Sequence, residues 1–120
     1  MTKILLVEDH SELRHVLRDR IEGLGFTTIT ATNGKEGVDT AVAEKPDLIM
    51  MNSMMPEMDG WEAARILRSN PETKDIPILA ATAMFQPAHL KAWLDVGCSD
   101  YIIKPFTLDE LSRKIRGLIG

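Results

Sequence analysis

The run Leu48-Ile49-Met50-Met51, which stops at Asn52, decides the fold of this chain. A short, continuously apolar run is expected for a central strand that is covered on both faces of a parallel sheet. Three other runs have the same form, each followed by a polar side chain: Ile4-Leu5-Leu6-Val7 before Glu8-Asp9, Ile78-Leu79-Ala80-Ala81 before Thr82, and Tyr101-Ile102-Ile103 before Lys104. If these runs are parallel strands, their carboxyl ends gather the polar groups in one crevice, where open α/β sheets bind ligands.

Stretches with helical periodicity separate the apolar runs. Leu13, Leu17, Ile21 and Leu24 recur every three or four residues and give a helix over about residues 11–24 one apolar face. Capping patterns open three further helices, at Asn33 with Glu36, at Asp59 with Glu62, and at Thr107 with Glu110. The predicted strands are Lys3–Val7, Phe26–Ala31, Leu48–Met51, Pro77–Ala81 and Asp100–Ile103. A further helix that begins near Pro87 completes a strict alternation of five strands with five helices, which predicts an α/β domain with a parallel sheet.

Size and composition restrict the class of protein. A chain of 120 residues forms about one domain, and its 44% hydrophobic and 27% charged composition is that of a soluble globular protein. A net charge of -4 argues against bulk nucleic-acid binding, which depends on clustered Lys and Arg. The single Cys98 cannot form an internal disulfide, and the short apolar run near the amino terminus cannot serve as a signal sequence or span a membrane. We therefore expect a cytoplasmic single domain, either alone or as part of a longer protein.

The polar groups at the strand ends have a shared chemistry. Glu8 and Asp9 are the hard oxygen donors that Mg²⁺ prefers. Lys104 adds a positive charge suited to a phosphoryl oxygen, and the hydroxyl group of Thr82 can contact a second such oxygen. Each group alone is common on protein surfaces. Their joint placement at one edge of a sheet indicates a site for a metal ion and a phosphoryl group.

Five motifs in chain order resemble the receiver domains of two-component response regulators, of the single-domain kind found in bacterial chemotaxis and cell-cycle signalling. The motifs are Glu8-Asp9, Asp47-Leu48-Ile49-Met50-Met51-Asn52, Met55-Pro56-Glu57-Met58-Asp59-Gly60, Thr82-Ala83 and Tyr101-Ile102-Ile103-Lys104-Pro105-Phe106. The resemblance covers nearly the whole chain and implies one receiver domain over residues 1–120. It also implies a flavodoxin-like, doubly wound sheet with strand order 2-1-3-4-5.

The resemblance further implies a role for each residue that matches a family motif. The Mg²⁺ ligands would be Glu8, Asp9, residue 52 and the backbone carbonyl of Met54. Thr82 and Lys104 would hold a phosphoryl oxygen. Tyr101 would turn inward when Thr82 moves, Ala83 would leave the acceptor accessible, and a cis bond before Pro105 would aim Lys104 inward.

Asn52 departs from the family pattern, which has an aspartate as the phosphoacceptor. The carboxamide lacks the nucleophilic carboxylate oxygen that accepts phosphorus from a phosphohistidine. It also lowers the formal charge of the acids around the metal from -3 to -2, so we expect weakened Mg²⁺ binding. Two explanations stay open: a naturally degenerate receiver that signals by partner binding alone, and a deliberate substitution that blocks a working receiver.

The expected function is therefore a conformational switch and partner-binding module in a phosphorelay, and not an enzyme. Its partners would be a histidine kinase or phosphotransfer protein and a downstream effector or output domain, with a homodimer as a further alternative. An exposed Trp93 near Tyr101 would suit an interface, whereas packing of Trp93 in the core is an equally valid interpretation. No direct contact with nucleic acid or a membrane is expected.

Two other functions come from different classes. A small Mg²⁺-dependent phosphatase or phosphotransferase would use Glu8, Asp9 and Lys104, but the chain offers it no nucleophile, general base or substrate lid. A scaffold domain with a vestigial site would show no Mg²⁺ binding.

Overall fold

Five parallel strands alternate with five helices. The computed structural model describes residues 2–53, 55, 58–83 and 86–119. The elements are β1 (Lys3–Val7), α1 (Ser11–Gly23), β2 (Thr27–Ala31), α2 (Gly34–Glu44), β3 (Leu48–Asn52), α3 (Gly60–Ser69), β4 (Ile78–Thr82), α4 (Pro87–Asp95), β5 (Asp100–Ile103) and α5 (Leu108–Ile119). They form one sheet with the order β2-β1-β3-β4-β5, which confirms the predicted topology.

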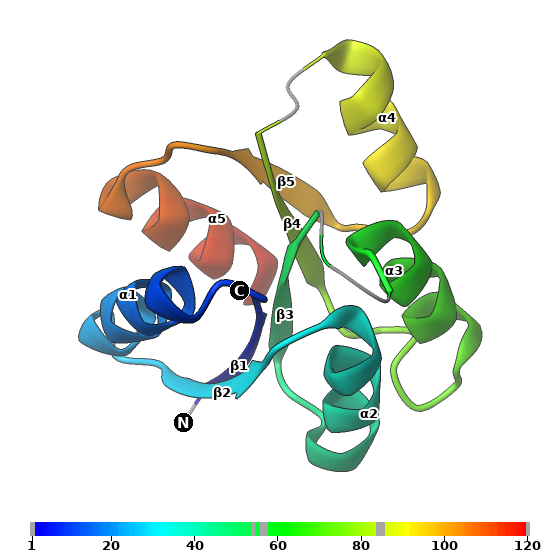
Figure 1. The fold of residues 1–120 in the computed structure, drawn as a ribbon, viewed down its shortest axis with the longest axis horizontal. Coiled ribbons are helices and arrows are strands. Elements are labelled where there is room, and N and C mark those ends of the chain that lie inside the picture. The colour runs from blue at the N-terminus through cyan, green and yellow to red at the C-terminus, as the bar shows by residue number, and fades with distance from the viewer. Residues whose placement is uncertain (1, 54, 56–57, 84–85, 120) are drawn as a thin grey trace.

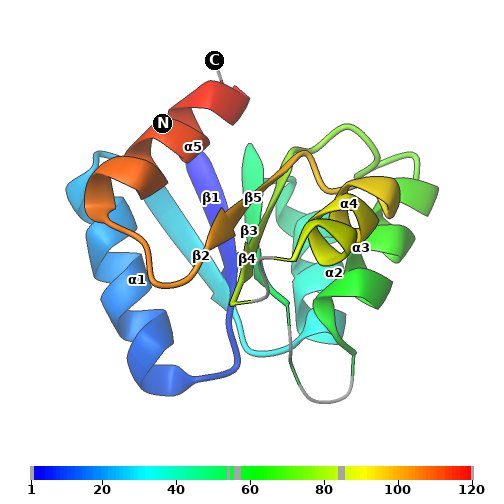
Figure 2. The same cartoon turned by 90° about the horizontal axis from the view of Figure 1, so that it is seen from above.

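The helices cover both faces of the sheet. Figures 1 and 2 show α1 and α5 on one face and α2, α3 and α4 on the other. Along β1, Leu5 and Val7 point toward the face of α2–α4, while Ile4 and Leu6 point toward α1 and α5. The residues of β3 alternate in the same way, and Leu48 to Met51 are fully or almost fully buried. Burial on both faces explains why these strands are continuously apolar in sequence.

The predicted helix caps are present. Each capping side chain accepts a hydrogen bond from the backbone N–H three residues later: Asn33 from Glu36 at 2.8 Å, Asp59 from Glu62 at 3.0 Å, and Thr107 from Glu110 at 3.1 Å. These bonds satisfy N–H groups that have no partner within the helix. The caps therefore fix where α2, α3 and α5 begin, each in the chain that follows a strand end at the carboxyl edge of the sheet.

Arg68 of α3 fastens the amino ends of β4 and β5. Its guanidinium donates hydrogen bonds to the carbonyl groups of Gly97 at 2.7 Å, Ile76 at 2.7 Å and Lys74 at 3.0 Å, and to the hydroxyl group of Ser99 at 3.3 Å. One side chain therefore holds the two loops that lead into these strands.

Cys98 lies beside Arg68, is 5% exposed and forms no disulfide. Burial raises the pKa of its thiol to about 12, although the positive charge of Arg68 opposes the rise. A thiol with so high a pKa is almost entirely protonated near neutral pH, so Cys98 behaves as a small apolar core residue. Within the described ranges, none of the helices has the length and apolar character needed to cross a membrane.

Candidate functional site

The strand register brings the predicted polar residues to one edge. Val7 of β1 is paired with Met51, so Glu8 follows at the level of Asn52, the last residue of β3. Asn52 is paired with Ala81, the residue before Thr82 at the end of β4. Thr82 is in turn paired with Ile103, directly before Lys104. Side chains that are up to about a hundred residues apart in sequence therefore meet at the carboxyl edge of the sheet.

The carboxamide of Asn52 connects the charged groups of this edge. Its Nδ2 donates hydrogen bonds to Glu8 Oε2 at 3.3 Å and to Asp9 Oδ1 at 3.2 Å. Its Oδ1 accepts a hydrogen bond from Lys104 Nζ at 2.7 Å. Carboxylates can only accept and an ammonium group can only donate, so these three partners fix the orientation of the amide. Asn52 thus forms a neutral bridge between two acids on one side and a cation on the other.

Glu8 is the most deeply buried acid of the site. Glu8 is 2% exposed, and its Oε2 accepts a hydrogen bond from the backbone N–H of His10 at 3.0 Å. Burial is the main reason that the pKa of Glu8 is raised, and Asp9 adds to the increase. The N–H of His10 and the charge of Lys104 lower it in part. The edge therefore favours a bound positive charge or a proton at Glu8.

Arg14 supports the two acids and was not found by the sequence analysis. Its Nη1 donates a hydrogen bond to the backbone carbonyl of Glu8 at 3.0 Å. Arg14 lies on α1, where an arginine on a polar helix face carries no sequence signal of a specific partner. Its contact holds the loop between β1 and α1, from which Glu8 and Asp9 point toward Asn52.

Thr82 and Lys104 lie on the neighbouring strand ends. Thr82 is fully buried, and its carbonyl accepts a hydrogen bond from the backbone N–H of Lys104 at 2.8 Å. The peptide bond between Lys104 and Pro105 is cis, as the resemblance implied. Ala83 is exposed, directly after Thr82. Ala83, Lys104 and Pro105 border a groove of about 410 Å³ that is also lined by Leu13, Leu17 and Arg20 of α1 and by Phe106.

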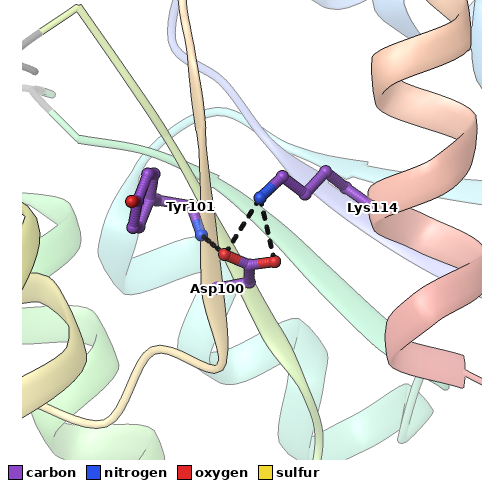
Figure 3. A network of polar contacts seen from close by, with 3 residues as sticks. All are labelled: Asp100, Tyr101 and Lys114. Carbon is purple, nitrogen blue, oxygen red and sulfur yellow. Dashed lines mark hydrogen bonds and ion pairs between the residues drawn. The ribbon is translucent and has the colours of Figure 1, made fainter.

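Tyr101 is half-buried on β5 and lies in a small polar network. Lys114 Nζ of α5 is 5.2 Å from the centre of the Tyr101 ring and contacts Asp100 Oδ2 at 3.1 Å. Figure 3 shows Asp100 between Tyr101 and Lys114, with its Oδ1 also accepting a hydrogen bond from the backbone N–H of Tyr101. This network lies between β5 and α5, away from Glu8 and Asp9.

Trp93 does not lie at the surface, so the hypothesis of an exposed Trp93 at an interface is wrong. Trp93 is 1% exposed, and its ring stacks on the ring of Trp61 with centroids 4.4 Å apart and an interplanar angle of 20°. The surface of α4 instead presents Leu94, which is 46% exposed. The equally valid interpretation, core packing of Trp93, is confirmed.

The donor set at this edge fits Mg²⁺ only in part. Glu8 and Asp9 supply suitable carboxylate oxygens, but the group that Asn52 turns toward them is an N–H donor. Among residues 2–53, 55, 58–83 and 86–119, no group of three or more His, Cys, Asp or Glu side chains is placed to hold a metal ion. Met54, whose carbonyl was expected to be a ligand, lies outside the described residues. A metal ion here would have two protein carboxylates and would have to displace the amide.

Comparison with known proteins identifies the family. A profile of the response regulator receiver domain matches residues 4–116. This chain belongs to the response regulator receiver domain family. It is 38% identical to the response regulator MprA of Mycolicibacterium vanbaalenii over 117 residues, which are 98% of this chain and 50% of that protein. The chain spans about half the length of the curated relatives it matches.

Solved structures of receiver domains have the same fold. Chemotaxis protein CheY4 of Vibrio cholerae is 27% identical, with a TM-score of 0.92 and 98% of each chain covered. The receiver domain of the sensor histidine kinase PA1611 of Pseudomonas aeruginosa is 32% identical, with a TM-score of 0.92 over 99% of this chain and 98% of that one. That structure has a magnesium ion coordinated in its active-site cleft. The chain is therefore a receiver domain of the two-component response regulators, a family of signalling modules.

Proposed function

We propose that residue 52 is the phosphoacceptor position of this receiver domain and that Asn52 prevents its phosphorylation. The observation that carries the proposal is the bridge from Asn52 to Glu8, Asp9 and Lys104, with all three contacts between 2.7 and 3.3 Å. In a working receiver, a carboxylate oxygen attacks the phosphorus of a phosphohistidine and the imidazole departs. The amide oxygen of Asn52 carries no full charge, and its nitrogen lone pair is delocalised, so neither atom is an adequate nucleophile.

The same bridge supports weakened Mg²⁺ binding by this chain. Each acid already accepts one hydrogen bond from the amide, and Lys104 donates to the amide oxygen. Rotating the carboxamide would turn its oxygen toward the acids, but it would also place an N–H donor against the ammonium group of Lys104. Binding of Mg²⁺ therefore requires the loss of good hydrogen bonds whichever way the amide points. We propose Glu8, Asp9, residue 52 and the Met54 carbonyl as the ligands in a version that carries aspartate.

The proposed role of the unmodified chain is a partner-binding module whose switch is not driven by phosphate. Residues 1–120 form one receiver domain, and Thr82, Ala83, Tyr101, Lys104 and Pro105 match the positions at which the family contacts and senses the phosphoryl group. We propose a cytoplasmic histidine kinase or phosphotransfer protein as the upstream partner and an effector or output domain as the downstream one. Docking near Tyr101 would involve the exposed parts of α4 and α5, without Trp93. A homodimer through this face is an alternative.

Labelling with acetyl phosphate tests the acceptor assignment. The unmodified chain, Asn52→Asp and Asn52→Ala are each incubated with acetyl phosphate and Mg²⁺, and intact mass is measured for the addition of one phosphoryl group. We expect labelling of Asn52→Asp only, and its loss when Asp9→Asn is added or when Mg²⁺ is chelated. Equal labelling of all three chains would show that residue 52 is not the acceptor.

A further inference from the structure

The Trp61–Trp93 pair joins α4 to the end of the strand that carries Asn52. Trp93 is the only residue of α4 that is buried, so this one side chain is the main anchor of the helix on the sheet. Its indole stacks on Trp61, the second residue of α3. Helix α4 is thus attached through the segment that begins α3, directly after the loop that follows residue 52 (Figure 1).

Gly60 stands between the Trp93 ring and the backbone of Asn52. A Cβ atom at this glycine would lie 2.9 Å from Trp93 Cη2 and 2.7 Å from the carbonyl oxygen of Asn52. Both distances are shorter than real Cβ contacts, so the Trp93 ring and the Asn52 carbonyl each lie close to the Gly60 backbone and leave no room for a side chain there. Gly60 also donates its N–H to the carbonyl of Ser53 at 3.1 Å. A side chain at position 60 would separate these three groups.

A second close approach holds the other side of the same segment. A Cβ atom at Gly34, the first residue of α2, would overlap the carbonyl oxygen of Met58. The described part of the segment between β3 and α3 is therefore held between α2 on one side and Trp93 on the other. Packed groups at van der Waals contact transmit displacements to one another because no free volume absorbs them.

We propose that Trp93 is a positioning residue for residue 52. By pressing Gly60 against the Asn52 carbonyl, the stacked Trp61–Trp93 pair fixes the direction in which side chain 52 leaves β3. The contacts of that side chain with Asp9 at 3.2 Å and with Lys104 at 2.7 Å are directional hydrogen bonds, which weaken when the group turns. It follows that the seating of α4 and the geometry of the acid–lysine edge depend on each other. The functional part of this inference rests on residue 52 being the acceptor position.

The alternative is that Trp93 only fills the core. The two interpretations differ in what Trp93→Phe changes. If Trp93 only fills the core, Trp93→Phe lowers stability and leaves the geometry around residue 52 unchanged. If Trp93 positions residue 52, Trp93→Phe alters that geometry even in a fully folded chain. Ile21→Val is the matched control, because Ile21 is fully buried but packs on the opposite face of the sheet.

The first measurement is the hydrogen exchange of the Asn52 side-chain amide, followed by NMR in the unmodified chain, Trp93→Phe and Ile21→Val. These hydrogens are protected by their bonds to Glu8 and Asp9. We expect exchange at least about fivefold faster in Trp93→Phe and unchanged within about twofold in Ile21→Val. Equal exchange in all three chains would overturn the inference, and this readout does not depend on phosphorylation.

The second measurement is the rate of labelling by acetyl phosphate, with the same two substitutions made in the Asn52→Asp chain. It is made at a temperature at which circular dichroism shows each variant to be folded. The rate of labelling by acetyl phosphate should fall at least about fivefold with Trp93→Phe, since displacements of about 1 Å of a reacting group can cost far more. Ile21→Val should leave the rate within about twofold. Unchanged labelling with Trp93→Phe would contradict the inference. If Asn52→Asp is not labelled at all, the proposed acceptor is wrong, and amide exchange alone decides the role of Trp93.

Discussion

The substitution Asn52→Asp should destabilise the domain when Mg²⁺ is absent, although it changes the shape of the side chain very little. It replaces an amide donor by a third carboxylate, at 3.3 Å from Glu8 and 3.2 Å from Asp9, while Lys104 lies at 2.7 Å. At an effective dielectric constant of about 20, each repulsion amounts to about 5 kcal/mol and the attraction to about 6 kcal/mol. The unrelaxed balance is a destabilisation of about 4 kcal/mol.

Relaxation reduces this loss. Glu8 is buried and already has a raised pKa, so it can take up a proton when a third acid arrives, and the partly exposed Asp9 can turn toward solvent. We therefore expect the free energy of unfolding to fall by about 1–3 kcal/mol in EDTA. For a domain of this size, that corresponds to a decrease of about 4–12 °C in Tm.

Thermal unfolding followed by circular dichroism, in EDTA and in MgCl₂, measures both parts of the prediction. Mg²⁺ at about one hundred times its Kd should restore about 2.7 kcal/mol to Asn52→Asp. The same concentration should change the unmodified chain much less. Asn52→Ala is the control, because it removes the bridge without adding charge and should gain little from Mg²⁺. The reasoning is refuted if Asn52→Asp is as stable as the unmodified chain in EDTA, or if Mg²⁺ stabilises both equally.

Three further predictions concern other parts of the chain. Burial raises the pKa of Glu8, so the folded chain keeps the Glu8 carboxyl protonated to higher pH than the unfolded chain does. The contribution of Glu8 to stability is therefore lost as the pH rises through its pKa in the folded chain. Glu8→Gln should therefore gain stability over the unmodified chain between about pH 4 and about pH 7 in EDTA, as urea unfolding would measure; a constant difference would contradict this. Arg68→Leu leaves the carbonyls of Gly97 and Ile76 without their donor and should cost about 3 kcal/mol; a loss below about 1 kcal/mol in urea would refute it. Cys98, with a pKa of about 12, should react with a thiol reagent only on unfolding, so rapid native labelling would be contrary evidence.

The sequence was sufficient to predict the fold and the edge of the sheet at which the polar side chains gather. Strands buried on both faces leave continuous apolar runs, and parallel strands place the residues that follow them at one edge. This rule alone predicts that Asn52, Thr82 and Lys104 lie at one edge, and the structure brings Asn52 and Lys104 into direct contact.

Other features could not be predicted, because they depend on distances between elements. Within Pro87–Asp95, the spacing of Leu90, Trp93 and Leu94 by three and four residues predicts one apolar face with all three buried alike, so the sequence did not reveal that Trp93 is buried while Leu94 is exposed. The orientation of the Asn52 amide follows from its partners on β1 and β5 and has no local signal. Likewise, the hydrogen bonds of Arg68 join backbone carbonyls, which every residue type carries.

The hydrogen bonds of Arg68 give the two ends of the sheet unequal resistance to local opening. All of them lie at the amino ends of β4 and β5, remote from Asn52. Transient opening should thus begin at the opposite edge, where the Asn52 carboxamide joins the strand ends alongside their backbone hydrogen bonds. A small rearrangement at the carboxyl edge can occur without separating the strands. The domain can therefore adapt to a ligand or partner at this edge and still keep its overall architecture.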